Sequence, residues 1–367
     1  MSARLVESER LHAEVRAFAK GESPKSFAEL AREIAEYQAR YSPAFARLVA
    51  LHRSDLADVD AIPSVPSDAF RMTRVAVHPE QEDAARFFTS GTTESARGMH
   101  ALRTTETYTE LATRFGRAAL VPEGTEPHVV ALAAEPADPP SSSLSFMMAD
   151  FMRAFQKSAR ETWLLDRSGP DLDGLERAAA RAGAARAPLL VLTTSLALYA
   201  LVRARGEPRL ALPPGSVVMQ TGGPKGQTTS VNPEELRREA AARFAIPEAA
   251  VVSEYGMTEL TSQLYEGTAP GGELSGPPNV YLAPPWLRVT PVDPVTLAPV
   301  PPGEVGLARF VDLGNVDSAV AVVTRDRIRV SGPGIELLGR EPGAPPRGCS
   351  LAVEALLGEA SDASRHG

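Results

Sequence analysis

Hydrophobic residues recur at helical spacing near the start of the chain. Phe27, Leu30, Ile34 and Tyr37 are three or four positions apart, with charged residues between them. Because an α-helix has 3.6 residues per turn, such positions share one face. Residues 5–54 are therefore predicted to be helical and to cover another part of the protein. A proline-containing passage over 55–68 leads from them into the core.

Short apolar runs alternate with helical patterns over residues 86–260. Strands are predicted at 75–77, 87–88, 129–133, 189–192, 216–219 and 251–252. Helices are predicted at 104–119, 146–155, 173–186 and 232–244. Alternating strands and helices are typical of a largely parallel sheet with helices on both faces.

Two helix starts carry capping signals. The apolar strand 189–192 runs into Thr194 and Ser195, either of which can cap the helix that follows. Asn232 stands before Pro233, and proline is favoured at the first position of a helix. Both helices are predicted to begin at these residues.

The pattern changes after residue 270. Prolines and glycines crowd residues 269–302, and short β-rich pieces follow. These pieces are 287–289, 305–311, 320–323 and 327–330. They predict a smaller β subdomain. The tail, 360–367, is polar and is expected to fray.

Composition narrows the class of protein. The chain has 367 residues, 43% of them hydrophobic, which suits a soluble globular protein with a large core in one or two domains. Its net charge is −8 without a basic cluster, so no nucleic-acid partner is expected. The single cysteine, Cys349, excludes internal disulfides and favours a reducing compartment.

Neither a signal peptide nor a membrane span is expected. The N-terminus is charged and lacks an apolar signal core. The longest uncharged apolar stretch, 187–202, is shorter than the roughly 20 residues that cross a bilayer. The protein is therefore expected to be cytoplasmic.

A loop of small hydroxylated residues follows the apolar run 86–88. It reads Thr89-Ser90-Gly91-Thr92-Thr93 and is followed by a cation, Arg97. Backbone N–H groups and hydroxyls in such a loop can converge on phosphate oxygens, and an arginine can neutralise them. A plain solvated turn is the alternative. The loop is not a Walker loop, since its Gly-Lys-Ser/Thr ending is absent.

A second polar segment follows the apolar residues Val251 and Val252 and reads Tyr255-Gly256-Met257-Thr258-Glu259. Tyr255 offers a flat face to a nucleotide base, and Glu259 is a hard oxygen ligand of the kind that Mg²⁺ takes beside phosphates. A helix-capping role is the alternative for Glu259.

In order and spacing, the two segments resemble the phosphate loop and the Tyr-Gly-x-Thr-Glu motif of the adenylate-forming superfamily. That superfamily contains acyl-CoA synthetases, luciferases and peptide-synthetase adenylation domains. The resemblance implies an α/β fold like the superfamily's N-terminal domain, with layered sheets and helices. It also implies ATP and Mg²⁺ as cofactors. Three further matches follow in order: Gly222-Gly223 for adenine, Thr324-Arg325-Asp326 for ribose and Leu338-Gly339-Arg340 for the hinge.

One subfamily is more similar, the LuxE-type acyl-protein synthetases of the bacterial fatty-acid reductase complex. The matching segments are 36–38, 41–45, 62–71, 312–315 and 347–351. They cover roughly residues 30–355. This resemblance implies a shortened C-terminal domain and an acyl-accepting cysteine at Cys349.

The loop and the tail depart from the superfamily pattern. Glu94 stands where glycine is usual, and an acid beside a triphosphate repels it unless its side chain points away. Arg97 stands where lysine is usual, which keeps the charge and changes the geometry. The last lysine is Lys225, so the lysine of the usual C-terminal domain is not assigned.

Four regions are expected from these matches. They are a helical N-terminal cover at 1–70, an α/β nucleotide- and acyl-binding core at 71–270, a β-rich subdomain at 271–338, and a hinge with a short tail at 339–367.

The implied activity is ATP-dependent activation of a carboxylic acid, a fatty acid by the subfamily match, to an acyl adenylate. Thr89, Thr93, Arg97 and Glu259 would act on the phosphates, and Cys349 would accept the acyl group for an acyl-CoA reductase-like or carrier-protein partner. Two alternatives stay open. One is a ligase that passes the acyl group to CoA, a carrier protein or an amine, and the other is a non-catalytic scaffold subunit.

Several of these residues have a simpler interpretation. Cys349 can be a small buried hydrophobe, although Arg347 two positions away favours thiolate character. Asp317 and Asp326 could each be an ordinary surface or turn acid, and Asp326 is favoured for the ribose because the resemblance includes it. Met147, Met148 and Met152 are interpreted as core residues, although flexible methionines also suit an acyl pocket. His100 lies near the loop, but a lone histidine more often contacts neither phosphate nor carboxylate.

Overall fold

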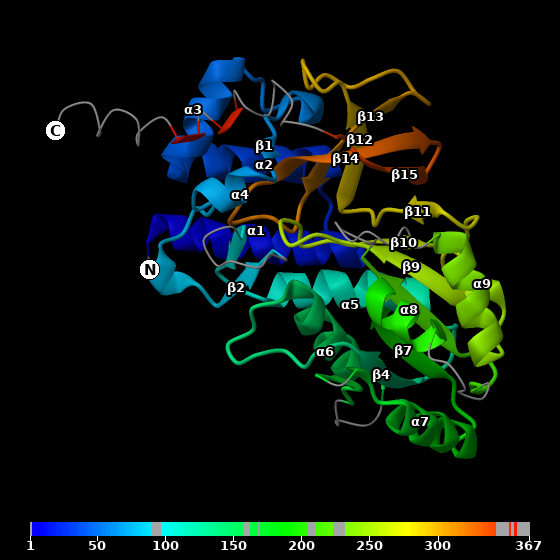
Figure 1. Cartoon of the computed structure of the whole chain (residues 1–367). Coiled ribbons are helices and arrows are strands. Elements are labelled where there is room, and N and C mark those ends of the chain that lie inside the picture. Colours follow the sequence, from blue (N-terminus) through cyan, green and yellow to red (C-terminus); the bar gives the residue numbers. More distant parts are fainter. Residues whose placement is uncertain are drawn as a thin grey trace. The chain divides into compact units, whose positions relative to one another are not determined.

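The chain folds into two compact units, each built from separate segments. The computed structural model describes residues 2–89, 97–156, 162–167, 169–203, 210–222, 232–342, 352–353 and 356–357 (Figure 1). Unit 1 comprises Met1–Leu111, Met257–Ser262 and Ala283–Gly367, and unit 2 comprises Ala112–Gly256 and Gln263–Leu282. The division into four regions stays a prediction.

The first helices of unit 1 confirm the helical N-terminal pattern. They are α1 (Ala3–Lys20), α2 (Phe27–Tyr41) and α3 (Pro43–His52). Ser26 and Glu29 form a capping box at the start of α2, which satisfies backbone donors that the helix itself leaves unpaired. Leu30, Ile34 and Tyr37 are fully buried, as their spacing predicts. One-turn elements follow at η1 (Val59–Ala61), α4 (Ala69–Met72) and η2 (Glu80–Glu82).

Antiparallel strands form the sheet of unit 1. Their order is β12 (Leu287–Val292), β13 (Val305–Asp312), β14 (Ala321–Ser331) and β15 (Gly334–Arg340), and β1 (Val65–Pro66) pairs with β14 in parallel. The prediction of two separate strands at 320–323 and 327–330 is wrong, because the single strand β14 runs through both ranges. Asp326 therefore lies within a continuous strand, where the pairing with β15 shifts between Asp326 and Ile328.

The strand before the small-residue loop does not join the parallel sheet. Instead β2 (Ala85–Phe88) and β3 (Met99–Leu102) form an antiparallel pair, in which Phe87 lies opposite His100. The strand predicted at 75–77 is also wrong. Those residues are irregular, and Val77 donates its backbone N–H to the Asp317 carbonyl at 2.9 Å.

Unit 2 contains the predicted parallel sheet. Neighbouring parallel strands are β4 (His128–Leu132), β7 (Leu189–Thr194), β8 (Val217–Thr221) and β9 (Val251–Tyr255). Next to β9, β10 (Leu264–Glu266) and β11 (Val280–Leu282) continue the sheet in antiparallel pairing. The other elements are α5 (Glu106–Leu120, which begins in unit 1), α6 (Ser143–Phe155), β5 (Leu165–Asp166), β6 (Gly169–Pro170), α7 (Leu172–Ala184), α8 (Ser195–Arg203), α9 (Pro233–Phe244) and η4 (Glu248–Ala250).

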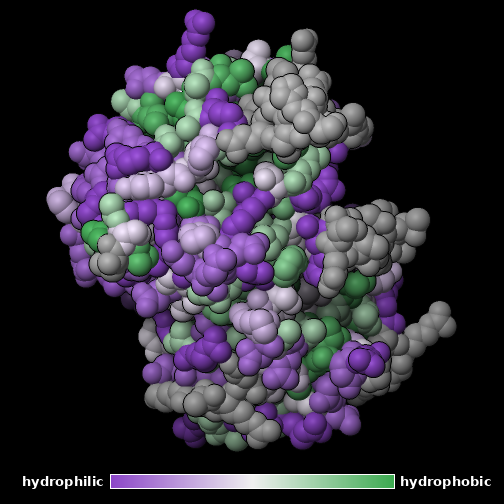
Figure 2. Space-filling model, turned by 90° about the vertical axis from the view of Figure 1, so that its left-hand side faces the viewer, coloured by the Kyte–Doolittle hydropathy of each residue, from purple (hydrophilic) through white to green (hydrophobic). Residues whose placement is uncertain are grey.

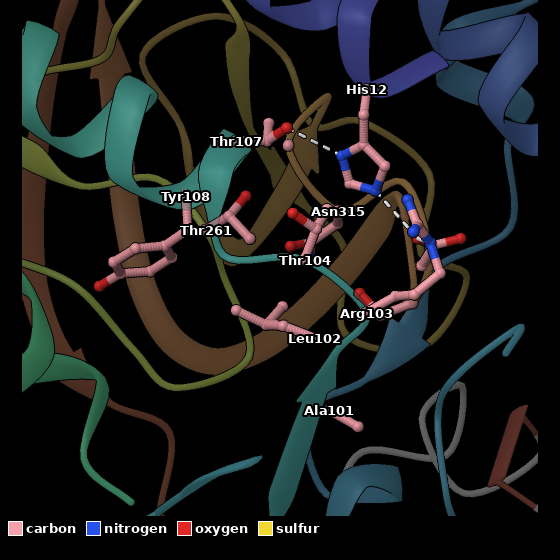
Figure 3. Close-up of a pocket in the computed structure, with 12 residues that line it drawn as sticks. His12, Ala101, Leu102, Arg103, Thr104, Thr107, Tyr108, Thr261 and Asn315 are labelled. Carbon is pink, nitrogen blue, oxygen red and sulfur yellow. Dashed lines mark hydrogen bonds and ion pairs between the residues drawn. The ribbon is translucent and has the colours of Figure 1, made fainter. Parts of the chain in front are cut away.

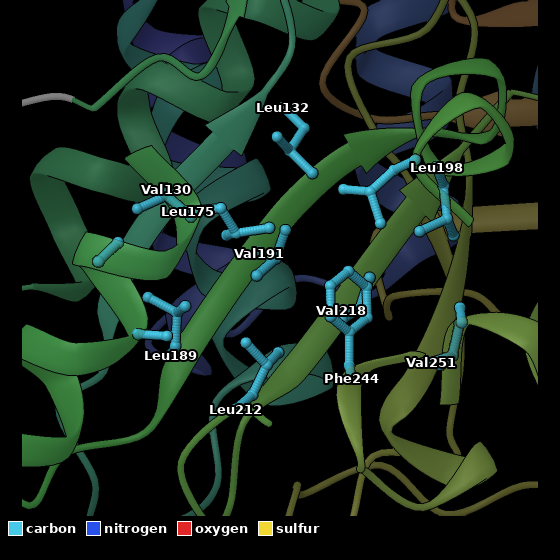
Figure 4. Close-up of a cluster of buried hydrophobic side chains, with 14 of the residues drawn as sticks. Val130, Leu132, Leu175, Leu189, Val191, Leu198, Leu212, Val218, Phe244 and Val251 are labelled. Carbon is cyan, nitrogen blue, oxygen red and sulfur yellow. The ribbon is translucent and has the colours of Figure 1, made fainter. Parts of the chain in front are cut away.

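Helices cover both faces of this sheet. On one face, side chains of α7, α8 and α9 pack with Val191, Val218 and Val251 in one buried cluster (Figure 4). Tyr265 belongs to the opposite face, because it pairs with Glu254 and neighbouring strand positions alternate between faces. Its ring lies 5.7 Å from that of Phe115 in α5.

The three methionines of α6 lie in the core, as predicted. Met147, Met148 and Met152 are at most 2% exposed. Both capping predictions are confirmed as well. Thr194 accepts the Ala197 N–H at 3.1 Å, and Asn232 accepts the N–H groups of Glu234 and Glu235.

The surface is mixed in polarity. On the face in Figure 2, hydrophilic residues are interspersed with smaller groups of hydrophobic ones. Large exposed hydrophobic residues of the described part include Val6, Leu51, Met72, Leu196, Val295 and Leu338. Among the described residues, no helix combines the length and apolar character needed to cross a membrane.

The fold prediction is confirmed. An α/β fold of layered sheets and helices with a smaller β subdomain was expected, and the structure has an α/β fold, with a large sheet that is mixed and not purely parallel.

Candidate functional site

The base of the small-residue loop is closed by hydrogen bonds. Thr89 donates its N–H to the Gly98 carbonyl at 2.9 Å, and its Oγ1 accepts the Gly98 N–H at 2.8 Å. Arg97 Nε donates to the Thr89 carbonyl at 2.8 Å, with its guanidinium over the Phe88 ring. Ser90, Gly91, Thr92, Thr93 and Glu94 lie outside the described residues. The loop therefore leaves and rejoins the hairpin at a fixed point.

His100 joins this hairpin to the Tyr-Gly-x-Thr-Glu motif. Its Nδ1 lies 2.8 Å from the Thr258 carbonyl oxygen, and its Nε2 lies 2.8 Å from Ser318 Oγ. A carbonyl only accepts, so Nδ1 carries the proton and Nε2 accepts the Ser318 hydroxyl. Burial lowers the pKa of His100 to about 4, so the ring is neutral near pH 7. Two segments 158 residues apart are thus held together in unit 1.

The residues around Glu259 are anchored from the segment 312–315. The Glu259 carbonyl accepts a hydrogen bond from Asn315 Nδ2 at 3.0 Å, and Glu259 is only 8% exposed. Buried Asp312 accepts the backbone N–H groups of Thr261 and Ser262, both at 3.0 Å. It also accepts the Gly314 N–H at 2.9 Å. A carboxylate with this many donors fixes the backbone around it.

Helix α2 supports the same segment. Gln38 Nε2 donates to the carbonyls of Asn315 and Val316 at 2.8 and 2.9 Å. Its Oε1 accepts the Val320 N–H at 3.1 Å. Two of the segments that carried the LuxE-type resemblance, 36–38 and 312–315, are therefore in direct contact.

Asp317 lies in a turn, which is one of the two positions considered for it, but its side chain is buried and not at the surface. It is 5% exposed and accepts four side-chain hydrogen bonds. The donors are Ser8 Oγ at 2.8 Å, His12 Nε2 at 2.9 Å, Tyr37 OH at 2.6 Å and Arg103 Nε at 2.9 Å. Burial would raise the pKa of Asp317, but these partners outweigh it and hold that pKa well below its ordinary value. No local signal could have found this, because the donors come from α1, α2 and the end of β3.

A small polar pocket lies beside Asp317, entirely within unit 1. Figure 3 shows His12 of α1 there, between Thr107 of α5 and the segment that carries Asn315. His12 Nδ1 lies 2.9 Å from Thr107 Oγ1. The free space is about 10 Å³, the volume that one water molecule needs. Buried Arg103 Nη2 and Asn315 Oδ1 have no hydrogen-bond partner among the described residues. The pocket suits a molecule of water size and is too small for an acyl chain.

The structure places Asp326 and Arg340 side by side. They are register partners on β14 and β15, and Arg340 Nε lies 3.2 Å from Asp326 Oδ1. Arg340 is 60% exposed, so its guanidinium can reach a ligand. The residues predicted for the ribose and the hinge are therefore neighbours.

In unit 2, predicted residues lie at the carboxyl ends of β8 and β9. Gly222 follows β8 with φ 75°, a left-handed conformation that favours glycine. A Cβ on Gly256 would lie 2.5 Å from Glu254 Oε1, so the Glu254 carboxylate would have to move to admit a side chain there. Thr221 Oγ1 donates to the Glu254 carboxylate between the two strands. Ligands of open α/β sheets bind at the carboxyl ends of the strands, which is where Gly222, Tyr255 and Gly256 lie.

The predicted residues divide between the units. Unit 1 contains Thr89, Arg97, Met257, Thr258, Glu259, Asp326 and Arg340. Unit 2 contains Gly222, Tyr255 and Gly256. Gly223 and Cys349 lie outside the described residues. The sequence analysis named His100 without finding its contact with Thr258, because the two residues are 158 positions apart.

Glu259 is compatible with a magnesium ion. Within the described ranges, no group of three or more His, Cys, Asp or Glu residues could hold a metal. Mg²⁺ beside a nucleotide commonly takes only one or two protein carboxylates, because phosphate oxygens and water complete its shell. A single carboxylate at Glu259 fits that donor set.

Two solved structures of one ligase share this fold. 2-Hydroxyisobutyryl-CoA ligase in the postadenylation state, in complex with R3-HIB-AMP, aligns with a TM-score of 0.63 and 13% identity over 86% of this chain and 67% of that one. Its open conformation with 2-HIB-AMP and CoA aligns with a TM-score of 0.60 and 12% identity over 84% and 73%. ATP-bound MatB from Rhodopseudomonas palustris aligns with a TM-score of 0.49 and 18% identity over 72% of this chain and 49% of that one.

The sequence itself gives no match. No protein-family model matches the chain, and no curated protein matches it. At 12–13% identity, the likeness to the ligase structures concerns the fold alone. The chain has the α/β fold of adenylate-forming ligases.

Proposed function

We propose that this chain activates a carboxylic acid with ATP, forming an acyl adenylate and pyrophosphate. The observation that carries the proposal is the contact between His100 and the Thr258 carbonyl. It brings the motif with Glu259 to the hairpin from which the small-residue loop extends. The fold shared with adenylate-forming ligases supports the same reaction.

The first step joins two anions, so its barrier is lowered by neutralising and positioning charge. The acid's carboxylate oxygen attacks the α-phosphorus, and the bond to the pyrophosphate oxygen breaks. Loop residues 89–93 and Arg97 would bind the leaving pyrophosphate. For this, Arg97 would exchange its bond to the Thr89 carbonyl for phosphate oxygens. Glu259 would hold Mg²⁺, which supplies positive charge beside the phosphates.

The nucleoside would be bound by residues of both sequence motifs. Gly222, Gly223 and Tyr255 would contact adenine, with backbone and ring surface in place of bulky side chains. Asp326 would accept hydrogen bonds from the ribose hydroxyls, and Arg340, which forms an ion pair with it, would be a second contact to the nucleotide. These roles are part of the proposal.

The second step transfers the acyl group to a thiol. A thiolate attacks the carbonyl carbon of the mixed anhydride, AMP leaves, and a thioester forms. By the LuxE-type resemblance the thiol is Cys349, the acid is a fatty acid, and an acyl-CoA reductase-like protein receives the acyl group. CoA is the second candidate for the thiol, because the shared-fold ligase was solved with CoA.

ATP–pyrophosphate exchange tests the first step. The purified chain is incubated with ATP, Mg²⁺ and labelled pyrophosphate, together with acids of increasing chain length. Exchange that depends on one acid supports the proposal. No exchange with any acid, while ATP still binds, would instead favour a non-catalytic scaffold.

Intact-mass measurement tests the second step. A mass increase equal to the acyl group, absent in Cys349→Ser, supports an acyl-enzyme. Acyl-CoA formation that is undiminished in Cys349→Ser would assign the acceptor role to CoA. Adenylate without any adduct, and no effect of Cys349→Ala, would exclude Cys349 as the acceptor.

A further inference from the structure

We propose that His100 is a positioning residue for adenylation, which holds the Thr258 carbonyl and thereby fixes Glu259 relative to the loop hairpin. This inference rests on the proposed function. His100 is not a catalytic residue, because both ring nitrogens contact the protein itself.

The imidazole is held from several sides. His100 is fully buried, and its strand position lies opposite Phe87. The Phe70 ring meets it edge-on, with centroids 5.6 Å apart. Ser318 occupies Nε2, so Nδ1–H is directed to Thr258. A ring in such surroundings has one orientation and one tautomer.

The backbone near Glu259 is tied at successive positions. His100 holds the carbonyl of Thr258, and Asn315 holds that of Glu259. Asp312 holds the N–H groups of the residues two and three positions beyond Glu259. Among these ties, only the one from His100 comes from the hairpin that bears the loop. Without it, the backbone at Thr258 and Glu259 loses its tie to the β2–β3 hairpin, and misplacement by about 1 Å can cost about 100-fold in rate.

Two amide variants separate the two nitrogens of His100. In His100→Asn the side-chain amide reaches the place of Nδ1 and can still donate to Thr258. In His100→Gln the amide reaches the place of Nε2 and can contact only Ser318. Both variants replace a ring by a neutral amide in the same buried site.

The experiment is steady-state ATP–pyrophosphate exchange with the acid that gives the fastest exchange in the chain-length series, together with thermal unfolding of each variant. We expect His100→Gln to lose about 100-fold in kcat, with the KM for the acid within about threefold of the original. His100→Asn should retain within about tenfold of the original kcat. Ser318→Ala should fall closer to the Asn variant, and His52→Gln at an exposed position should change nothing.

The outcomes are distinguishable. Equal kcat losses in the Asn and Gln variants, or a more active Gln variant, would overturn the role of His100 while leaving adenylation intact. Losses that follow only the unfolding temperature would overturn it too, since a structural role predicts that correlation. A wild-type chain without exchange would overturn the proposed function, and this role with it.

Discussion

His12 Nε2 lies 2.9 Å from Asp317 Oδ2, across 305 residues of sequence. Both side chains are 5% exposed, and Arg103 Nε approaches the same oxygen at 2.9 Å. Asp317 thus compensates a buried cation and accepts hydrogen bonds from two helices. Its carboxylate holds α1 and α2 of unit 1 against the turn that follows Asn315.

We expect Asp317→Asn to lower the free energy of unfolding by about 3 kcal/mol, because Arg103 loses its buried counter-charge. Tyr37→Phe removes one hydrogen bond and should cost about 1 kcal/mol. Urea denaturation measures both changes, and Glu22→Gln, at an exposed position, is the control. A change below about 0.5 kcal/mol in Asp317→Asn would show that the network does not stabilise the fold.

Stability should depend on pH in two separate windows. Burial depresses the pKa of His100 from 6.5 to about 4, so between these values the unfolded chain binds a proton that the folded chain does not. The contribution of His100 is therefore complete above pH 6.5 and is lost as the pH falls towards 4. The loss amounts to about 3 kcal/mol. Denaturation at several pH values should show this slope, and His100→Asn should flatten it.

The second window belongs to Asp317. Its folded pKa is lowered, so its stabilisation is complete above its unfolded value of about 4 and decreases as the pH falls below that. Asp317→Asn should flatten stability only in this lower range. If both variants flattened the same range, the assignment of the two windows would be wrong.

Much of the fold could be predicted from local patterns. The capping signals at Asn232 and Thr194 act within one helical turn, and the helices begin at these residues or immediately after them. The alternation of strands and helices predicted the parallel pairing of β4, β7, β8 and β9, because crossover helices require it. The strand partners of Phe87 could not be predicted, since an apolar run fits a hairpin as well as a parallel sheet.

The candidate site was predictable only in part. The motifs identified Glu259, Asp326 and Arg340 as residue types suited to a nucleotide, and the structure makes the last two neighbours. Asp317 looked like a turn acid because nothing near it in sequence contacts its carboxylate. Its burial depends on donors up to 309 residues away, and such contacts leave no local pattern.

Asp326→Asn and Arg340→Gln should act on ATP binding and leave stability unchanged. The ion pair is largely exposed on the Arg340 side, and such pairs contribute about 0.5 kcal/mol or less. We expect the KM for ATP in the exchange assay to rise at least about tenfold in Asp326→Asn, because the proposed ribose acceptor is weakened. The same β14–β15 hairpin offers a control, since Arg329 and Glu336 form a comparable exposed pair at 3.0 Å. Arg329→Gln should alter neither the stability nor the KM for ATP. An equal rise of this KM in Arg329→Gln would contradict the role of Asp326.

Thr89 closes the hairpin at the base of the proposed phosphate loop, through its hydroxyl as well as its backbone N–H. Its Oγ1 accepts the N–H of buried Gly98, so Thr89→Val keeps the shape and leaves that N–H without its partner. We expect a loss of about 1–2 kcal/mol in stability. If the loop binds pyrophosphate, kcat for exchange should fall by about tenfold or more as its base loosens. Thr89→Ser retains the hydroxyl acceptor and should recover most of the stability and most of kcat.

Thr125→Val, which removes a hydroxyl donor from a turn in unit 2, is the matched control and should leave exchange unchanged. Full exchange activity in Thr89→Val would mean that closure at this residue is not needed to hold phosphate.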